Sequence, residues 1–306
     1  MTDEHNGSAV YQVLLYYRFT PIDDPTAFAE EHRTLCERLG LRGRILISGN
    51  GINGTVSGPT ESCRTYMDTL HADSRFTGMP FKIDEVDGHV FQKLFVRVKP
   101  ELVTFRTDHE LDPAKKTGTH LSPAEYHEML QRDDVIILDG RTDYEFDLGH
   151  FRNAIRPDVA SFKEFPQWIA EHMGDVKDRP ILTYCTGGIR CELLTAWMLE
   201  EGFTNVYQLD GGIVTYGKDP KVKGALWDGK CYVFDERIAV DINHTDDRRV
   251  VGTCHHCGRP TERYVNCANL DCHKQHLSCE VCEERMARSC SPECMEAPRH
   301  EILGLN

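Results

Sequence analysis

The sequence lacks an apolar run long enough to cross a membrane. No segment of its 306 residues approaches the roughly 20 consecutive apolar residues of a transmembrane helix. The first twelve residues, MTDEHNGSAVYQ, also lack the basic stretch and the apolar core of an export signal. We therefore expect a cytoplasmic protein with no membrane partner.

Positive charge is scarce as well. The chain carries 35 Lys and Arg against 49 Asp and Glu, a formal net charge of −14. This balance argues against a nucleic-acid partner, DNA in particular, unless basic residues share one face. The sequence does not show whether its basic groups converge. These groups are Arg42 and Arg44; Lys93, Arg97, Lys99 and Arg106; Lys115 and Lys116; Arg152 and Arg156; Arg248 and Arg249.

Signatures of organic cofactors are missing too. The chain has no glycine fingerprint of a dinucleotide fold, no facial iron triad at a recognisable spacing and no flavin motif. We therefore assign no organic cofactor, and the source of electrons for a redox reaction is not visible in the sequence.

Cysteine, in contrast, is plentiful, with thirteen residues. Eight of them form close pairs near the end of the chain: Cys254 and Cys257, Cys267 and Cys272, Cys279 and Cys282, and Cys290 and Cys294. Thiolates at this spacing bind one metal ion together, and four pairs suffice for two tetrahedral zinc sites. Because this region has few apolar residues, zinc would supply much of its folding free energy.

Two points about these pairs stay open from sequence. The four pairs can chelate in sequential order or interleave. A histidine can also replace a cysteine as a ligand, and the neighbouring histidines are His255, His256, His273 and His276.

Another cysteine pattern, ILTYCTGGIRCE, starts at Ile181. Its apolar beginning predicts a buried strand that ends on Cys185, and Cys191 to Glu201 predicts an amphipathic helix. Glycines in the intervening turn let backbone N–H groups converge on one point, and the helix dipole adds positive potential there. A thiolate would be stabilised by these dipoles and by Arg190, so we expect the pKa of Cys185 to lie below the ~8.5 of a free cysteine. Cys185 is therefore the candidate nucleophile.

The loop between Cys185 and Arg190 holds four residues: Thr186, Gly187, Gly188 and Ile189. Cysteine-dependent phosphatases use a loop one residue longer to wrap a tetrahedral phosphate, so this shorter loop disfavours phosphatase chemistry. Cys191 follows directly. It could act as a resolving thiol or simply pack in the core, and the sequence does not decide between these roles.

Two further motifs flank this loop. Leu138-Asp139-Gly140-Arg141 is followed by Glu145, by Gly149-His150-Phe151 and by Ala154; Leu209-Asp210-Gly211-Gly212-Ile213 comes after the loop. Together they resemble the rhodanese family over residues 118–216. The alternation of strands and helices predicts a parallel sheet covered by helices on both faces. Asp139 and Arg141 are expected to form an ion pair that supports the loop, a structural role in the family.

The first hundred residues show a different order of elements: strand, helix, strand, strand, helix, strand, with one short extra strand. This order predicts a ferredoxin-like α/β sandwich. We expect strands at 10–19, 44–48, 52–57, 81–85 and 91–98, and helices at 25–39 and 60–71. Tyr16, Tyr17 and Phe19 could stack on RNA bases, although aromatic residues that alternate along a strand more often form core.

We therefore predict an α/β protein with four segments. These are a ferredoxin-like (acylphosphatase-like) domain at 1–105, a linker at 106–119, a rhodanese domain at 120–222 and a cysteine-rich zinc-binding region at 223–306.

This combination resembles the bacterial TrhO family of rhodanese-domain tRNA uridine hydroxylases. The most specific stretches are GRILISGNGINGTVSG, from Gly43, and CTGGIRCE, from Cys185. The resemblance implies formation of 5-hydroxyuridine at wobble position 34, with molecular oxygen as co-substrate and the anticodon arm of tRNA as partner. For the mechanism, two hypotheses stay open: a cysteine thiolate attacks C6 of uridine and makes C5 nucleophilic, or Cys185 carries a persulfide or sulfenate that delivers the oxygen. In either case we expect Cys185 to be essential and Arg190 and the loop amides to bind the developing anion.

Two other functions remain possible from the residues alone. A plain sulfurtransferase would carry a persulfide on Cys185, and a non-catalytic module would only bind RNA or protein. The oligomeric state and the set of tRNAs are not visible in the sequence.

Overall fold

The computed structural model describes residues 10–107, 111–272 and 274–303. The chain divides into two compact units, the first comprising Met1–Thr117 with Asp235–Arg237 and the second comprising Gly118–Phe234 with Ile238–Asn306. Among the described residues, no helix is both long and apolar enough to span a membrane.

The first unit is a five-stranded sheet with two helices. Its elements are β1 (Tyr11–Phe19), α1 (Pro25–Arg38), β2 (Arg42–Ser48), β3 (Gly51–Pro59), α2 (Thr60–Ala72), β4 (Lys82–Val86) and β5 (Leu94–Val98). The strand order is β4-β1-β3-β2-β5, antiparallel except that β5 runs parallel to β2. The first four strands have the ferredoxin-like order and β5 is the extra strand, so the predicted fold is confirmed.

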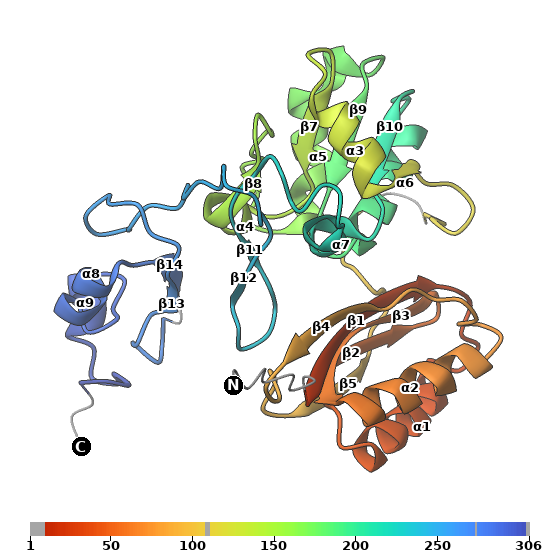
Figure 1. Ribbon diagram of the computed structural model, residues 1–306, viewed down its shortest axis with the longest axis horizontal. Coiled ribbons are helices and arrows are strands. Elements are labelled where there is room, and N and C mark those ends of the chain that lie inside the picture. Colours follow the sequence, from red (N-terminus) through yellow and green to blue (C-terminus); the bar gives the residue numbers. More distant parts are fainter. Residues whose placement is uncertain (1–9, 108–110, 273, 304–306) are drawn as a thin grey trace, which may run out of the picture. The chain divides into compact units, whose positions relative to one another are not determined.

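Both helices of this unit cover one face of the sheet (Figure 1). Successive side chains of a strand point to opposite faces, so every second residue enters the core. Leu14 and Tyr16 of β1 are fully buried there against Cys36 of α1 and Tyr66 of α2. Tyr16 is therefore a core residue and cannot stack on RNA, whereas Tyr17 is only partly buried.

The second unit begins with alternating strands and helices. They are β6 (Thr119–Leu121), α3 (Pro123–Leu130), β7 (Ile136–Asp139), α4 (Asp143–Leu148), β8 (Gly149–Phe151), η1 (Phe162–Glu164), α5 (Phe165–His172), η2 (Gly174–Val176), β9 (Ile181–Tyr184), α6 (Ile189–Glu200), β10 (Val206–Leu209) and α7 (Gly212–Lys218). The helix α3 starts with the predicted cap: Ser122 and Glu125 form a reciprocal capping box with proline at the first helical position.

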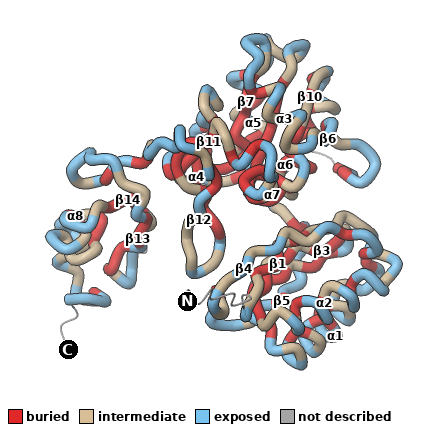
Figure 2. Tube along the Cα trace, viewed as in Figure 1, coloured by how far each residue is buried: buried red, intermediate tan, exposed pale blue. Residues whose placement is uncertain are grey.

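The sheet of this unit is parallel, with the order β6-β10-β9-β7. Leu182 and Tyr184 of β9 pack against Tyr126 of α3 and Tyr216 of α7. Thr183 points to the other face, where its side chain hydrogen-bonds Cys191 of α6. The predicted parallel sheet with helices on both faces is confirmed, and its strands form the buried centre of the domain (Figure 2).

The helix after the candidate nucleophile differs from its prediction. It begins at Ile189 instead of Cys191, because Gly188 adopts a positive φ of 105° and closes the turn earlier. It is also not amphipathic, since its residues from 191 to 198 are all buried. The prediction was wrong because polar residues of this helix were assigned to an exposed face. Glu192, for example, is buried, and its carboxylate accepts hydrogen bonds from His120 and Gln208.

The rest of the second unit is irregular and rich in cysteine. Its elements are β11 (Trp227–Tyr232), β12 (Ala239–Asp241), β13 (Tyr264–Asn266), β14 (Gln275–Leu277), α8 (Glu280–Arg285) and α9 (Pro292–Met295). Strand β11 pairs with β8 of the rhodanese-like part. A small apolar cluster joins Leu148 of α4 to Tyr232, Tyr264 and Leu277. The domain boundary at residues 222 and 223 stays a prediction.

Candidate functional site

Cys185 lies where the sequence predicts it, directly after β9 and before α6. Its side chain is fully buried. The backbone N–H of Gly188 donates a hydrogen bond to its Sγ at 3.2 Å. The later glycine motif closes the other side of the turn, because Ile213 N–H donates to the carbonyl of Cys185 at 3.0 Å. A side chain at Gly212 would lie 2.6 Å from that carbonyl oxygen, so only glycine fits.

The environment of this sulfur favours the thiolate. Burial raises the pKa of Cys185, but a hydrogen bond from the Cys191 thiol, the positive charge of Arg190 and the Gly188 N–H outweigh it and lower the pKa to about 5. Burial and the neighbouring Cys185 thiolate raise the pKa of Cys191 well above its usual value. At neutral pH the pair therefore consists of an ionised Cys185 and a protonated Cys191 that donates to it.

Arg190 is held by a partner that the sequence pattern did not assign to the site. Its guanidinium donates to both carboxylate oxygens of Glu145, at 2.7 and 2.8 Å, and to Thr186 Oγ1 at 3.2 Å. The Glu145 side chain is fully buried. Burial alone would raise the pKa of Glu145, but the charge of Arg190 prevails and lowers it to about 2. The site thus holds a fixed cation whose donors already face a carboxylate.

A sequence signal for Glu145 does exist. Thr142 and Glu145 form a capping box at the start of α4: Glu145 accepts hydrogen bonds from the Thr142 N–H at 3.2 Å and from its hydroxyl at 2.8 Å. The T-x-x-E spacing therefore predicts that the carboxylate of Glu145 is held at the helix start. The spacing does not predict that this carboxylate also contacts Arg190.

Asp139 and Arg141 form the predicted ion pair. Arg141 Nη2 lies 2.6 Å from the Asp139 carboxylate, and both side chains are fully buried. The same Nη2 donates to the carbonyl of Gly149 at 2.7 Å. The guanidinium also lies 5.6 Å from the ring of Tyr184 and 5.1 Å from that of Trp227. The pair thus joins the ends of β7, β8 and β9 beneath the loop.

The loop encloses the sulfur. Thr186, Gly187 and Gly188 are buried like Cys185, and Ile189 and Arg190 are only partly exposed. No surface of Cys185 is exposed to solvent. A substrate as large as a nucleobase can therefore reach the sulfur only after neighbouring groups move.

The eight paired cysteines gather into two groups of four. One contains Cys254, Cys257, Cys279 and Cys282, and the other contains Cys267, Cys272, Cys290 and Cys294. Within each group all sulfurs lie within 4.8 Å of one another. The pairs thus interleave, the first with the third and the second with the fourth. Among the described residues no histidine joins either group; His273 is not one of the residues that the structure describes.

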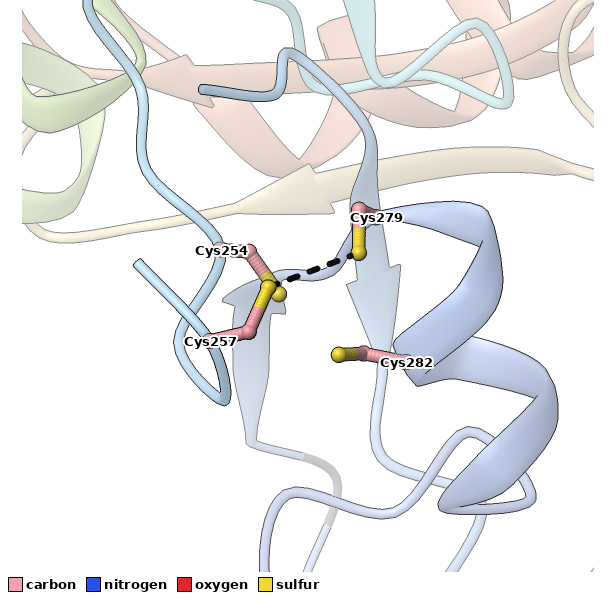
Figure 3. A group of neighbouring side chains, drawn as sticks. All are labelled: Cys254, Cys257, Cys279 and Cys282. Carbon is pink, nitrogen blue, oxygen red and sulfur yellow. Dashed lines mark hydrogen bonds between the residues drawn. The ribbon is translucent and has the colours of Figure 1, made fainter. Parts of the chain in front are cut away.

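The spacing of the sulfurs fits a tetrahedral metal site. Zn–S bonds of about 2.3 Å give a tetrahedron with edges of about 3.8 Å. Cys257 Sγ and Cys279 Sγ are 3.7 Å apart, and their group points its sulfurs toward a common centre (Figure 3). In the other group, Cys290 Sγ lies 3.7 Å from the Sγ atoms of Cys272 and Cys294. Both groups can hold a metal ion and are compatible with zinc.

Several of the basic residues named in the sequence analysis form ion pairs with aspartates. Arg152 pairs with Asp228 and Asp247. Arg156 contacts Asp147 at 2.7 Å, and Arg248 contacts Asp241 at 3.1 Å. These arginines thus have carboxylate partners within the second unit.

Family models match three consecutive parts of the chain. They are the UPF0176 acylphosphatase like domain at residues 11–102, the rhodanese-like domain at 122–219 and the rhodanase C-terminal region at 228–295.

Curated relatives match almost the whole chain and share one name, tRNA uridine(34) hydroxylase. The protein from Bacillus velezensis is 54% identical over 290 residues, which cover 95% of this chain and 90% of the relative. The protein from Bacillus licheniformis is 53% identical with the same coverage. The protein from Oceanobacillus iheyensis is 51% identical over 300 residues, covering 96% of this chain and 93% of the relative.

Proposed function

The chain belongs to the family of the tRNA uridine(34) hydroxylases, and we propose that it converts uridine 34 of tRNA to 5-hydroxyuridine at Cys185. The observation that carries this assignment to a residue is the placement of the buried Cys185 sulfur, which accepts a hydrogen bond from the Gly188 N–H at 3.2 Å and lies near Arg190. These neighbours lower the pKa of Cys185 to about 5 and favour its thiolate at neutral pH. The substrate is then the anticodon arm, which contains position 34, and the cell compartment is the cytoplasm.

The reaction starts with the thiolate. Cys185 attacks C6 of uracil, the S–C6 bond forms, and the electron pair of the C5–C6 double bond moves onto C5 and the O4 carbonyl. C5 then binds molecular oxygen and, with one proton, becomes a hydroperoxide. A thiol takes the outer oxygen atom as a sulfenic acid and leaves a hydroxyl on C5. Loss of the C5 proton and departure of the Cys185 thiolate restore the double bond of the product.

We assign the oxygen-accepting thiol to Cys191. It is protonated and already hydrogen-bonded to Cys185. Its sulfenic acid condenses with the released Cys185 thiol, forming a disulfide and water. The balance is one uridine, one O2 and two thiols in, and one 5-hydroxyuridine, one water and one disulfide out. An external thiol then reduces the disulfide for the next turnover.

The remaining site residues position this pair. Because Arg190 is clamped by Glu145, its charge stays beside the thiolate and beside the anion that forms on the ring. The backbone N–H groups of Gly188 and Cys191 add their dipoles at the sulfur. Asp139 and Arg141 keep the strand ends beneath the loop in place.

We assign zinc to both cysteine groups, one ion each, in a structural role. All four ligands in each group are cysteine, which is typical of closed structural zinc sites and leaves no open position for catalysis. An ion bound in each group would hold β13, β14, α8 and α9 together, where the apolar cluster is small.

Nucleoside mass spectrometry tests the proposal. Unmodified tRNA is incubated with the protein and a thiol, in air and without oxygen, alongside the Cys185→Ser variant. We expect uridine to gain one oxygen atom only with the native protein in air. Modification by Cys185→Ser would refute the role of this cysteine. No modification, together with a persulfide on Cys185 after thiosulfate treatment, would instead identify a sulfurtransferase.

A further inference from the structure

One face of the first unit's sheet is not covered by helices. In β2, Ile45 and Ile47 enter the core under α1 and α2, so Arg44 and Leu46 point the other way. The register pairs Arg44 with Phe95 and Leu46 with Arg97 of β5. Neighbouring residues in register share a face, so Phe95 and Arg97 lie on this helix-free side. We call this side of the sheet the open face.

Cations gather on the open face although the whole chain carries a net charge of −14. Alternate positions along β2 and β5, with the residues that extend β5 at each end, supply them. They are Arg42, Arg44, Lys93, Arg97 and Lys99, and all are exposed. No described carboxylate pairs with any of these five. They belong to two of the basic groups whose convergence the sequence could not reveal, and Arg106 of the second group is not among them.

Aromatic rings lie among these cations. Phe95 is 38% exposed and lies between these cations, opposite Arg44 in the register of β2 and β5. The Arg97 guanidinium lies 5.3 Å from its ring centroid. On β1, Tyr17 and Phe19 have ring centroids 6.3 Å apart, and the Lys82 ammonium lies 4.7 Å from the ring of Tyr17.

One carboxylate of β4 lies on the open face as well, and it has a cationic partner. Asp84 shares the open face, because β4 pairs it with Val13 of β1, and it is neutralised by Arg237 of the same unit at 2.8 Å. At that end Val90 and Phe91 pack on Val13 and cover it. The exposed residues of the open face are Phe95 and the cations of β2 and β5, and Tyr17 is partly exposed.

We propose that the open face binds single-stranded nucleotides of the RNA substrate, with bases on the aromatic rings and phosphates on the cations. A sheet that presents aromatic rings is a known way to bind unpaired bases, and cations between the rings follow the backbone. The aromatic rings between the cations favour RNA over an acidic protein, because unpaired bases stack on such rings. The inference rests on the proposed function for the identity of the RNA, since the anticodon loop is the unpaired region next to position 34.

RNA binding is measured directly, without reference to catalysis. A fluorescent anticodon stem-loop with U34 is titrated with the full-length protein at several salt concentrations, and fluorescence anisotropy gives the affinity. The variants are Arg44→Ala, Arg97→Ala and Phe95→Ala. The matched control is Arg38→Ala, an exposed arginine at the end of α1 on the helical side. Circular dichroism melting verifies that each variant is folded.

The arginine variants and the phenylalanine variant should differ in how their RNA affinity depends on salt. Arg44→Ala and Arg97→Ala should each weaken binding and reduce the slope of log affinity against log salt by about 0.7, the value for one phosphate contact on a single strand. Phe95→Ala should weaken binding roughly 5- to 150-fold with an unchanged slope, because stacking is not ionic. Arg38→Ala should bind like the native protein.

The inference is overturned if the folded Arg44→Ala and Arg97→Ala variants keep the native salt slope, or if Phe95→Ala keeps the native affinity. Equal binding of a fully paired hairpin stem would also overturn it. The fate of the proposed function is separate. If the native protein binds the stem-loop, and the variants lose that binding, but no uridine gains oxygen, the hydroxylase assignment fails while the RNA-binding face stands.

Discussion

Replacing Cys191 tests how the site generates its nucleophile. The pKa of Cys185 is lowered from 9.0 to about 5, and the hydrogen bond from the Cys191 thiol is the largest of the effects that lower it. A hydrogen bond to a charged group contributes about 1.5 to 3 kcal/mol. At 1.36 kcal/mol per pKa unit, its loss in Cys191→Ala should raise the pKa of Cys185 by about 1 to 2, to about 6 to 7. Arg190 and the Gly188 N–H remain to stabilise the thiolate.

Cys191→Ser separates the two roles assigned to this residue. Its hydroxyl still donates a hydrogen bond, so the pKa of Cys185 should stay nearer to 5 than in Cys191→Ala. A hydroxyl cannot form a disulfide, however, so hydroxylation should fail in both variants. A resolving thiol without a hydrogen-bonding role would predict the same pKa in the native protein and in both variants.

The assay is the rate of iodoacetamide alkylation of Cys185 against pH, followed by mass spectrometry of its peptide. The thiolate is the reactive form, so the rate rises with pH through the pKa. Cys231→Ala is the control, because Cys231 is another buried cysteine of the second unit that makes no hydrogen bond to Cys185. A midpoint that stays at about 5 in Cys191→Ala would refute the reasoning.

Three further predictions concern stability. Glu145→Gln leaves the charge of Arg190 without its carboxylate, so urea unfolding should show a loss of about 3 to 5 kcal/mol; a loss below 1 kcal/mol would contradict this. Because Arg190 lowers the pKa of Glu145 from 4.5 to about 2, the pair's contribution is complete above pH 4.5 and is lost as pH falls through about 2, and Glu145→Gln should lack this acid dependence in urea titrations across that range. Native mass spectrometry should find two zinc ions per chain, and a strong chelator should release the amide protection of residues 254–294 in hydrogen exchange while the first unit stays protected; full protection without metal would contradict the structural role.

Local patterns in the sequence predict the parts of this protein that local physics determines. The core face of β1, the cap at Ser122 and the turn after Cys185 depend on alternation, on capping residues and on glycines, all of which are visible within a few positions. The Asp139 and Arg141 ion pair also lies within one short motif. The sequence alone is therefore sufficient to predict these features.

Contacts between distant segments cannot be predicted in this way. Glu145 and Arg190 are far apart in sequence, and only the parallel arrangement of β7 and β9 brings their helices together. The interleaved ligation likewise depends on how the β13 and β14 hairpin folds back. The basic residues of β2 and β5 share a face only because these strands are neighbours with a defined register. The burial of α6 was also not predicted, because polar residues such as Glu192 are buried in it through hydrogen bonds to distant residues.

A single-turnover reaction under 18O2 tests the central claim most directly. The reduced protein is mixed with unmodified tRNA in the absence of an external thiol, and the labelled nucleoside and the Cys185–Cys191 disulfide are quantified from the same sample. The mechanism predicts 5-hydroxyuridine with one 18O atom, at most one per chain, and an equal amount of disulfide. Labelled product with both thiols still reduced, or labelled product from Cys185→Ser, would contradict it.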